Sequence, residues 1–327
     1  MRTLAALAIL TAALALAGLA IGEVPLPPAA LFDILSGSGR ADPGLAMILH
    51  DLRLPRVALA LLAGAALALA GAISQAVMRN PLAEPGVLGI NAGAALAVMI
   101  GLVGMRGLPP GIAPLAGFAG SLAMAGAVYL LAWRRGVTAL RLILVGIGLG
   151  ALASALTTVL TAFGELARVQ TALIWLAGSL HHADWPAVRL LGLWLVLPGA
   201  CAMMAARQLD LIRLGDSFAR ARGQHVTRLR ALMILACAAI SGAAVAATGL
   251  IGFVGLIAPH LARRLVGPLH RLALPASALV GALMVTAADL LGRTIIAPVQ
   301  LPAGIVTALI GAPVFGALLW RHRLAPA

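Results

Sequence analysis

The sequence predicts an all-α integral membrane protein with about ten transmembrane helices, and three observations support this fold class. The chain of 327 residues is 62% hydrophobic and 10% charged, with a mean hydropathy of +1.06, whereas soluble domains carry about 25% charged residues. The apolar residues gather in blocks close to the length of about 20 residues that a helix needs to cross a bilayer. Arginine-containing segments separate these blocks. We therefore treat residues 1–327 as a single transmembrane domain.

Ten apolar blocks are candidates for the spans. The eighth is the shortest, and we expect Pro259 and His260 to interrupt its helix, with His260 bonding backbone groups that the break sets free. The expected spans are residues 4–21, 57–78, 87–103, 112–133, 142–162, 188–206, 229–250, 251–261 with flanks, 272–291 and 304–320.

Residues 53–89 are the most informative stretch. Arg53 and Arg56 precede an apolar run, and Asn80 and Pro81 follow it. Proline disfavours helical geometry in the residue before it, so the helix should end there. Small residues recur along the run at helical spacing, and in lipid such residues let a second helix approach closely. They are Gly64, Ala65, Ala68, Gly71 and Ala72.

A second stretch resembles the first without a gap. Residues 64–73 (GAALALAGAI) match residues 242–251 (GAAVAATGLI), and the same offset places Pro81 on Pro259. Two Ala/Gly-rich membrane helices can match by composition alone, but transporters often contain internal duplications. We favour a duplication, and since the two helices would run in opposite directions, the repeat would be inverted.

The N-terminal block has two interpretations. The first 20 residues contain a charge, an apolar core and small residues at the end, as a secretory signal does. A retained first span fits equally well. We favour retention, because removal would leave an odd number of spans and move the N-terminus to the other side of the membrane.

The arginines orient the chain. All 23 basic residues are arginines, and with 10 acidic residues they give a net charge of +13. Such a charge could suggest nucleic-acid binding, but these arginines lie between spans, where the positive-inside rule explains them. If the N-terminus is cytoplasmic, sixteen arginines, including Arg134 and Arg135, lie inside, and seven, including Arg40 and Arg106, lie outside. We expect both termini in the cytoplasm, surrounding membrane lipid, and no nucleic-acid partner.

Three segments between spans are long. We expect residues 22–50 to be an external loop with one short helix, and residues 163–186 to be a second external segment. Residues 207–230 form a basic, amphipathic internal segment broken at Gly215 and Gly223. The segment could be a solvated loop, but its periodic apolar residues favour two packed short helices on the cytoplasmic face. These residues are Leu209, Ile212, Leu214 and Phe218.

Few residues suggest chemistry within this chain. The sequence contains no lysine to complete a phosphate-binding glycine loop and no spacing typical of a His/Cys metal site. We interpret Cys201 and Cys237 as small buried hydrophobes and the His181-His182 pair as a solvated loop feature. Asp289 lies inside an apolar block four residues before Arg293. It could serve as a proton relay, but a structural pair with Arg293 is favoured.

Several segments together resemble the FecCD-type permease family, the transmembrane subunits of type II ABC importers for ferric siderophores, haem and cobalamin. They occur in the family's order and cover most of the chain from residue 52 onward. The matching segments are LRLPR (52–56), GAALALAG (64–71), RNPLAEPGVLG (79–89, with Gln75 before it), WLAGSL (175–180), LGDSFARARG (214–223), GLIGFVGLIAPHLAR (249–263), residues 270–293 and LPAGIVTALIGAPVFGALL (301–319).

The resemblance implies a type II ABC importer permease in the inner membrane, paired with a second permease that is this chain or a paralogue. A cytoplasmic ABC ATPase dimer would bind ATP and Mg²⁺, so this chain would be neither an enzyme nor a cofactor-binding protein. A periplasmic binding protein would deliver the cargo. The implied ATPase-coupling residues are Leu214, Gly215, Asp216, Ser217, Phe218, Ala219, Arg220 and Gly223.

The resemblance also assigns two further sites. Arg53, Arg56 and Arg293 would receive acidic residues of the binding protein, a charge-complementary contact that sets orientation and association rate. The cytoplasmic gate would lie at Asn80 and Leu82 and at Ala139 and Leu140. Apolar residues at 139–140 depart from the small hydroxyl residues familiar there, but a hydrophobic constriction can still exclude water.

The cargo that the resemblance favours is a ferric siderophore, such as one of citrate type, since residues 169–185 resemble those permeases most. A haem or cobalamin importer remains an alternative. Two other classes also remain open: an ion-coupled secondary transporter, and a membrane scaffold without transport.

Overall fold

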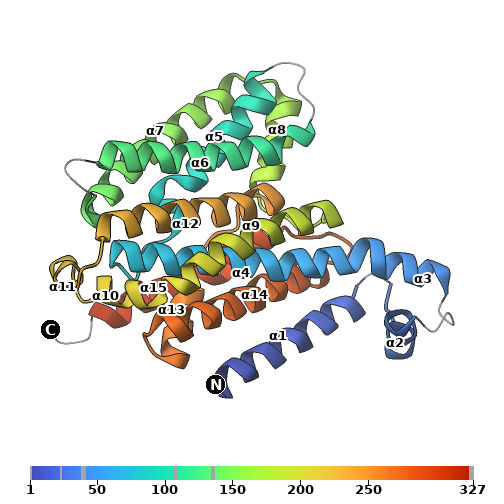
Figure 1. Ribbon diagram of the computed structural model, residues 1–327. Coiled ribbons are helices and arrows are strands. Elements are labelled where there is room, and N and C mark those ends of the chain that lie inside the picture. Colours follow the sequence, from blue (N-terminus) through green and yellow to red (C-terminus); the bar gives the residue numbers. More distant parts are fainter. Residues whose placement is uncertain (1, 23, 38–41, 106–109, 134–136, 324–327) are drawn as a thin grey trace.

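The computed structural model describes every residue except 1, 23, 38–41, 106–109, 134–136 and 324–327, and the described residues contain helices and no strand. Figure 1 shows them as a layered bundle of roughly parallel and antiparallel helices. In chain order they are α1 (Arg2–Ala20), α2 (Pro28–Ser36), α3 (Pro43–Met47), η1 (Ile48–Arg53), α4 (Leu54–Met78), η2 (Pro85–Leu88), α5 (Ile90–Met99), η3 (Ile100–Gly104), η4 (Pro110–Ile112), α6 (Ala113–Ala132), α7 (Ala139–Phe163), α8 (Leu166–Leu176), α9 (Trp185–Met204), α10 (Ala206–Arg213), α11 (Asp216–Ala221), α12 (Val226–Thr248), α13 (Val254–Val266), α14 (His270–Thr294) and α15 (Ala303–Arg323).

The predicted membrane architecture is confirmed. Seven of the described helices are long and apolar enough to cross a membrane, and shorter apolar helices occupy Ile90–Gly104, Leu166–Leu176 and Ala303–Ala317. Each of the ten expected spans contains a helix: α1, α4, α5 with η3, α6, α7, α9, α12, α13, α14 and α15. About ten spans are therefore consistent with the structure.

Two expectations about helix ends are wrong. Helix α13 runs without a break through Pro259, because a proline in a helix removes one hydrogen bond and neighbouring groups can compensate. Residues 22–50 contain α2 and then a helix that is continuous from Pro43 to Met78. The Asp42 carboxylate caps its start by accepting a hydrogen bond from the Gly44 N–H at 2.6 Å, and Pro43 has the fixed φ of a first helical residue.

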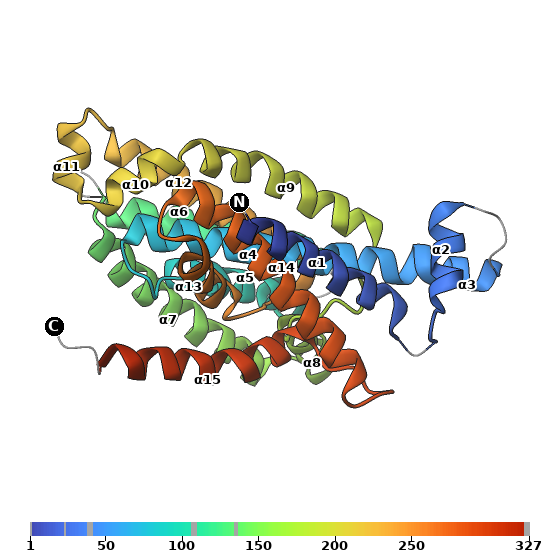
Figure 2. The ribbon, with the colours of Figure 1, turned by 90° about the horizontal axis from the view of Figure 1, so that it is seen from below.

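Helix α4 is the centre of the bundle. Most of its residues are buried, and α14, α12, α13 and α9 pack around it. Figures 1 and 2 show these helices beside α4 from two directions. The main buried cluster combines apolar residues of α4 with those of the surrounding helices.

Pairs of glycines allow the closest of these contacts. A Cβ atom on Gly64 would clash with the backbone carbonyl of Gly281 in α14, and a Cβ atom on Gly281 would clash with the carbonyl of Gly64. Gly71 lies in the same way against the carbonyl of Gly255 in α13. The small residues of α4 were predicted to let one other helix approach closely. In the structure they let two helices approach, α14 and α13.

The two similar stretches run in opposite directions, as expected for an inverted repeat: α4 runs from α3 toward α11, and α12 runs the other way (Figure 1). The match does not extend as far as predicted. Helix α4 continues to Met78, whereas α12 ends at Thr248. Pro81 consequently lies in a turn after a helix and Pro259 lies inside one, so these two prolines are not structurally equivalent.

The bundle has two ends, which we call the α3 end, where α2 and α3 project, and the α11 end, where α10 and α11 lie (Figure 2). Helix α1 begins and α15 ends toward the α11 end. Arg40, Arg106, Arg134 and Arg135, which entered the prediction of orientation, lie outside the described residues.

We expect Gly64→Ala to lower the stability of the protein in detergent by about 1–3 kcal/mol, the usual cost of overpacking, because the added methyl group meets the Gly281 carbonyl. Gly126→Ala in α6 is the matched control, since nothing lies within 4 Å of its Cβ position. Thermal unfolding followed by circular dichroism measures both. Equal melting temperatures for the two variants would contradict the proposed close contact.

Candidate functional sites

The segment at the α11 end folds as two short helices, α10 and α11, as predicted. Gly215 and Gly223 end these elements with φ of 121° and 78°, values that side-chain-bearing residues rarely adopt. Leu209 and Ile212 are fully buried, but Leu214 is 63% exposed and Phe218 39%. Of the four periodic apolar residues, Leu209 and Ile212 therefore pack the segment onto the bundle, while Leu214 and Phe218 remain on its surface.

Other contacts hold this helix pair in place. Ala219 is buried with Ile212 and with Val226, the first residue of α12. The Asp210 carboxylate accepts hydrogen bonds from the backbone N–H and ring Nδ1 of His270 at 3.0 and 2.6 Å. Ser217, Arg220 and Gly223 lie on the exposed side.

Asp216 in α11 is the centre of an ion-pair cluster. Its two carboxylate oxygens accept hydrogen bonds from Nη1 and Nη2 of Arg230 in α12 at 2.7 and 2.9 Å. Arg79 Nε, at the end of α4, lies 4.0 Å from the same carboxylate. Arg230 is 1% exposed and also donates from Nη1 to the carbonyl of Val137 at 3.0 Å.

Burial acts to raise the pKa of Asp216, but the hydrogen bond and charge of Arg230, with the charges of Arg79 and Arg220, outweigh it and hold the pKa below its ordinary value. A carboxyl whose folded pKa is lowered stabilises the fold above the ordinary pKa, near 4, and loses that contribution as the pH falls through the folded value. The Asp216 carboxylate is therefore ionised at neutral pH.

The expected gate residues lie in two segments at this same end of the bundle. Arg79 has a positive φ of 50° and ends α4. The Asn80 side chain then accepts a hydrogen bond from the Leu82 N–H at 2.9 Å. Leu82 is 38% exposed.

The second gate segment begins α7. Thr138 caps this helix, whose first residues are Ala139 and Leu140, and Leu140 is 67% exposed. Ala83 and Val137, one from each segment, belong to the same buried cluster. Each segment thus contributes one buried residue to the main cluster and exposes one leucine.

At the α3 end, two arginines bind the carboxyl end of α1. Arg53 Nη1 donates to the carbonyls of Leu19 and Ala20 at 2.7 and 3.0 Å, and Arg293 Nη2 donates to the carbonyl of Gly18 at 2.6 Å. The last carbonyls of a helix have no partner within the helix. The two guanidinium groups supply such partners together with positive charge, which the helix dipole favours at this end.

Arg56 and Asp289 form a buried ion pair beside them. Arg56 Nη2 lies 2.9 Å from Asp289 Oδ1, and the two side chains are 13% and 4% exposed. Arg56 Nε lies 3.0 Å and 3.2 Å from the two carboxylate oxygens. Arg293 Nε lies 3.7 Å from Asp289 Oδ2, so the predicted Asp289–Arg293 pair exists but is the weaker of the two.

These contacts change the expectation for the three arginines. Arg53 and Arg293 are 6% and 8% exposed, so little of either side chain is available to acidic residues of a partner. The reason is that helix-end carbonyls of α1, which lie far away in sequence, take up their donors. Arg56 keeps slightly more exposure and also donates from Nη1 to Gln300 Oε1 at 2.8 Å, an oxygen 3.1 Å from His181 Nδ1.

The remaining chemical candidates have structural surroundings. Cys237 is fully buried, with Sγ 3.1 Å from Ser74 Oγ between α12 and α4, and Cys201 is half-buried. His181 and His182 are exposed and their rings make an edge contact. Among the described residues no group of three or more His, Cys, Asp or Glu side chains is arranged to hold a metal ion.

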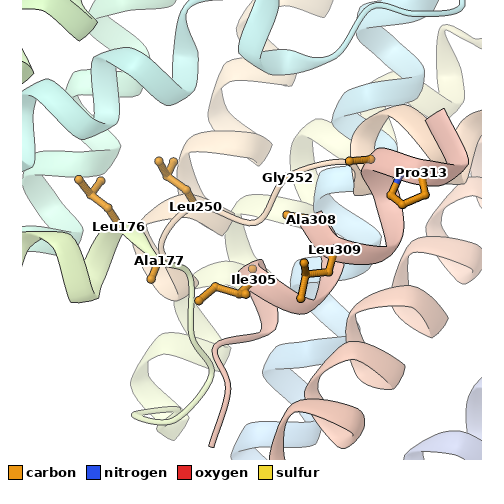
Figure 3. A pocket seen from close by; sticks show the side chains of 10 residues that line it. Leu176, Ala177, Leu250, Gly252, Ile305, Ala308, Leu309 and Pro313 are labelled. Carbon is orange, nitrogen blue, oxygen red and sulfur yellow. The ribbon is translucent and has the colours of Figure 1, made fainter. Parts of the chain in front are cut away.

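Two cavities open between helices of the bundle. The α15 cavity, of about 630 Å³, is lined by α15, the end of α8 and the linker between α12 and α13. Figure 3 shows Ile305 and Leu309 of α15 across from Leu176 and Leu250. The α5 cavity, of about 440 Å³, lies between α5 and α7 and contains the Asn91 and Ser154 side chains. Leu250 lines both cavities.

The segment with Leu250 is non-helical backbone between α12 and α13. Within a membrane such backbone is tolerated only where protein covers it or it lines a cavity. Glycines hold it in position. A Cβ atom on Gly178 or on Gly304 would clash with or crowd the Leu250 carbonyl, and Gly249 has a φ of 72°. Gly304 N–H also donates to the carbonyl of Gly178 at 2.9 Å.

Sequence analysis missed four residues that the structure places at these sites. Arg230 and Arg79 surround Asp216, Gln300 contacts Arg56, and Leu250 separates the cavities. Arg230 offered a signal, because it lies within an apolar helix and an arginine there needs a partner. The other three offered none.

The FecCD transport family model matches residues 9–321 of the chain. The Fe(3+)-citrate import system permease protein YfmE of Bacillus subtilis is 42% identical over 315 residues, which is 96% of this chain and 93% of that protein. The hemin transport system permease protein HmuU of Yersinia pestis is 42% identical over 279 residues, 84% of this chain and 83% of that protein.

A solved structure of a metal-chelate type ABC transporter in an inward-facing conformation has the same fold. It superimposes with a TM-score of 0.88 at 30% sequence identity and covers 98% of this chain and 99% of the other. The likeness therefore extends over the whole arrangement of helices, including both ends.

We expect Asp289→Asn to destabilise the protein by about 3 kcal/mol, because removing one partner of a buried pair leaves uncompensated charge, here on Arg56 and Arg293. Glu165→Gln is the matched control: its pair with Arg168 is also at 2.9 Å, but Glu165 is 68% exposed, and such pairs contribute about 0–1 kcal/mol. Thermal unfolding in detergent measures both. A melting temperature of Asp289→Asn equal to that of the control would contradict this assignment.

Proposed function

This chain belongs to the FecCD transport family, and from that premise we propose that it is the permease subunit of a binding-protein-dependent ABC importer. It carries an iron chelate through the inner membrane, with both termini and the α11 end in the cytoplasm and the α3 end in the periplasm. Members of this family are not themselves enzymes. A partner ATPase binds ATP and Mg²⁺ and supplies the energy.

The observation that carries the proposal is the helix pair α10–α11. It is anchored by buried Leu209 and Ile212 and by the Asp216–Arg230 pair, yet it exposes Leu214 and Phe218. Exposed large apolar residues on a firmly held polar segment are typical of a protein interface. The ATPase docks here, with residues 214–223 as the coupling element.

The binding protein docks at the α3 end. Arg56 is the arginine that can contact it, while Arg53 and Arg293 shape the surface from beneath by fixing the end of α1. The cluster contains three arginines and one carboxylate, so its net positive charge attracts an acidic surface and sets the orientation of the encounter.

The cargo moves along the two cavities. The α15 cavity lies nearer the α3 end, where α15 begins, and the α5 cavity lies nearer the gate segments at Leu82 and Leu140. A second permease, either this chain or a paralogue, closes the pathway on the other side. Leu250 stands where one cavity meets the other.

The lining favours an intact chelate as cargo. The side chains at both cavities carry no charge, and Asn91 and Ser154 supply the polar groups in the α5 cavity. A bare metal ion would need carboxylate, imidazole or thiolate ligands, whereas a chelated ion already has its ligands. We propose a ferric siderophore of citrate type, since the citrate permease relative covers more of the chain than the hemin permease relative.

Haem is the second candidate, because the hemin permease is as similar in identity as the citrate permease. An ion-coupled secondary transporter is disfavoured. Such a transporter needs a carboxylate that can gain and lose a proton within the membrane, and Asp289 in α14 is instead held between Arg56 and Arg293.

Reconstitution with its ATPase and binding protein tests the function. We expect liposomes containing all three to take up ferric citrate when ATP is supplied on the α11 side, and to take up none without ATP. Haemin with a matching binding protein tests the second cargo in parallel. Uptake of either chelate by the permease alone, driven by a proton or sodium gradient, would refute the proposal.

Replacing Leu250 tests the pathway. We expect Leu250→Trp to reduce ATP-dependent uptake at least about tenfold, because added bulk narrows the junction of the two cavities, while the ATPase subunit still co-purifies. Leu193→Trp is the control, as Leu193 is 69% exposed on α9 and lines neither cavity. Equal uptake by both variants would show that cargo does not pass Leu250.

A further inference from the structure

Arg230 connects the coupling element to the expected gate. The residue lies in the second turn of α12 and is 1% exposed. It binds both carboxylate oxygens of Asp216 on one side and the carbonyl of Val137 on the other. Asp216 begins α11, and Val137 stands two residues before the start of α7.

The same carboxylate reaches the other gate segment. Arg79 Nε lies 4.0 Å from Asp216 Oδ1, and Arg79 directly precedes Asn80, whose side chain holds the Leu82 N–H. One buried ion pair therefore touches the helix on which the ATPase docks and both segments that expose a gate leucine.

The bidentate contact between Arg230 and Asp216 resists movement of α11 relative to α12. A guanidinium group presents its donors in a rigid planar fork, so a bidentate pair fixes direction as well as distance. Nε of Arg230 is buried without a hydrogen-bond partner among the described residues, so the geometry is set by the contacts of Nη1 and Nη2. If α11 moves, Arg230 must follow Asp216 and pull on Val137, or a buried charge loses its partner.

We propose that Arg230 is a positioning residue that transmits movement of α11 to the gate at residues 137–140 and, through Asp216 and Arg79, to the gate at residues 79–82. This inference rests on the proposed function and adds to it a route from the ATPase interface to the pathway. An arginine that only anchored α11 would need Asp216 alone; the bond to Val137 is what makes Arg230 a link.

The test uses the full complex of permease, ATPase and binding protein in liposomes. Arg230→Lys keeps a positive charge for Asp216 but has a single ammonium group in place of the fork, and Arg230→Met removes the charge. Arg264→Gln is the control, since Arg264 is an exposed arginine in the last turn of α13 at the same end. Co-purification of the ATPase, the rate of ATP hydrolysis and ferric citrate moved per ATP are measured for each.

A reporter in the gate separates linkage from anchoring. Leu140→Cys in a Cys201→Ala background presents one accessible thiol, because Cys237 is fully buried. In the otherwise unchanged protein we expect ATP to alter the rate at which a maleimide labels this thiol. In Arg230→Lys, we expect the ATPase to remain bound while the ATP-dependent change in labelling and the cargo moved per ATP both fall about fivefold or more, the lower range of allosteric couplings.

The inference is overturned if Arg230→Lys and Arg230→Met both match Arg264→Gln in labelling response and in cargo per ATP. If both variants instead lose the ATPase, the exchange Asp216→Arg with Arg230→Asp decides. That exchange restores an ion pair but places a carboxylate against the Val137 carbonyl. If the exchange restores ATPase binding but not transport, the transmitting role of Arg230 is supported. If it restores both, Arg230 only holds α11 in place and the inference is overturned.

These outcomes are distinct from failure of the proposed function. If the unchanged complex moves neither ferric citrate nor haemin with ATP, the function is refuted whatever the variants do. If the unchanged complex transports and the Arg230 variants are fully coupled, the function stands and the role of Arg230 is refuted.

Discussion

The structure depends on direct backbone contact between helices in a lipid environment. Apolar side chains gain little by leaving lipid for each other, so helices in a membrane associate through close packing and hydrogen bonds. Gly64 and Gly281 bring α4 against α14, and Gly71 brings α4 against α13 beside Gly255. With its centre fixed in this way, the bundle can leave the less buried helices α7 and α15 at the sides of the cavities.

A cluster of charged residues lies at each end of the bundle, and the two clusters have different partners. At the α3 end, Arg56 and Arg293 pair with the carboxylate of Asp289, while Arg53 and Arg293 donate hydrogen bonds to carbonyls of α1. At the α11 end, Asp216 gathers Arg230 and Arg79 from different parts of the chain. The first arrangement supplies partners to the end of α1, and the second holds α11 against α12 and the end of α4.

The sequence predicted those features that depend on local composition and period. Apolar blocks gave the spans, Asn80 and Pro81 marked the end of α4, and the period of Leu209 and Ile212 gave the buried side of α10. It could not assign partners that lie far away along the chain. Arg293 binds Gly18 across 275 positions, and Arg56 binds Asp289 across 233. Without knowledge of these distant partners, the sequence cannot distinguish exposed arginines from arginines in a buried cluster. The period also could not tell that Leu214 and Phe218 would stay on the surface while Leu209 and Ile212 were covered.

The bonds from Arg53 and Arg293 to α1 have a consequence for biogenesis. Helix α1 receives one donor from Arg53, 34 positions after Leu19, and the other from Arg293 in α14, 275 positions after Gly18. The contacts at the end of α1 are therefore incomplete until α14 has been synthesised and inserted. The α3 end of the bundle is accordingly completed by the insertion of α14, and without that helix the end of α1 would lack one of its two arginine partners.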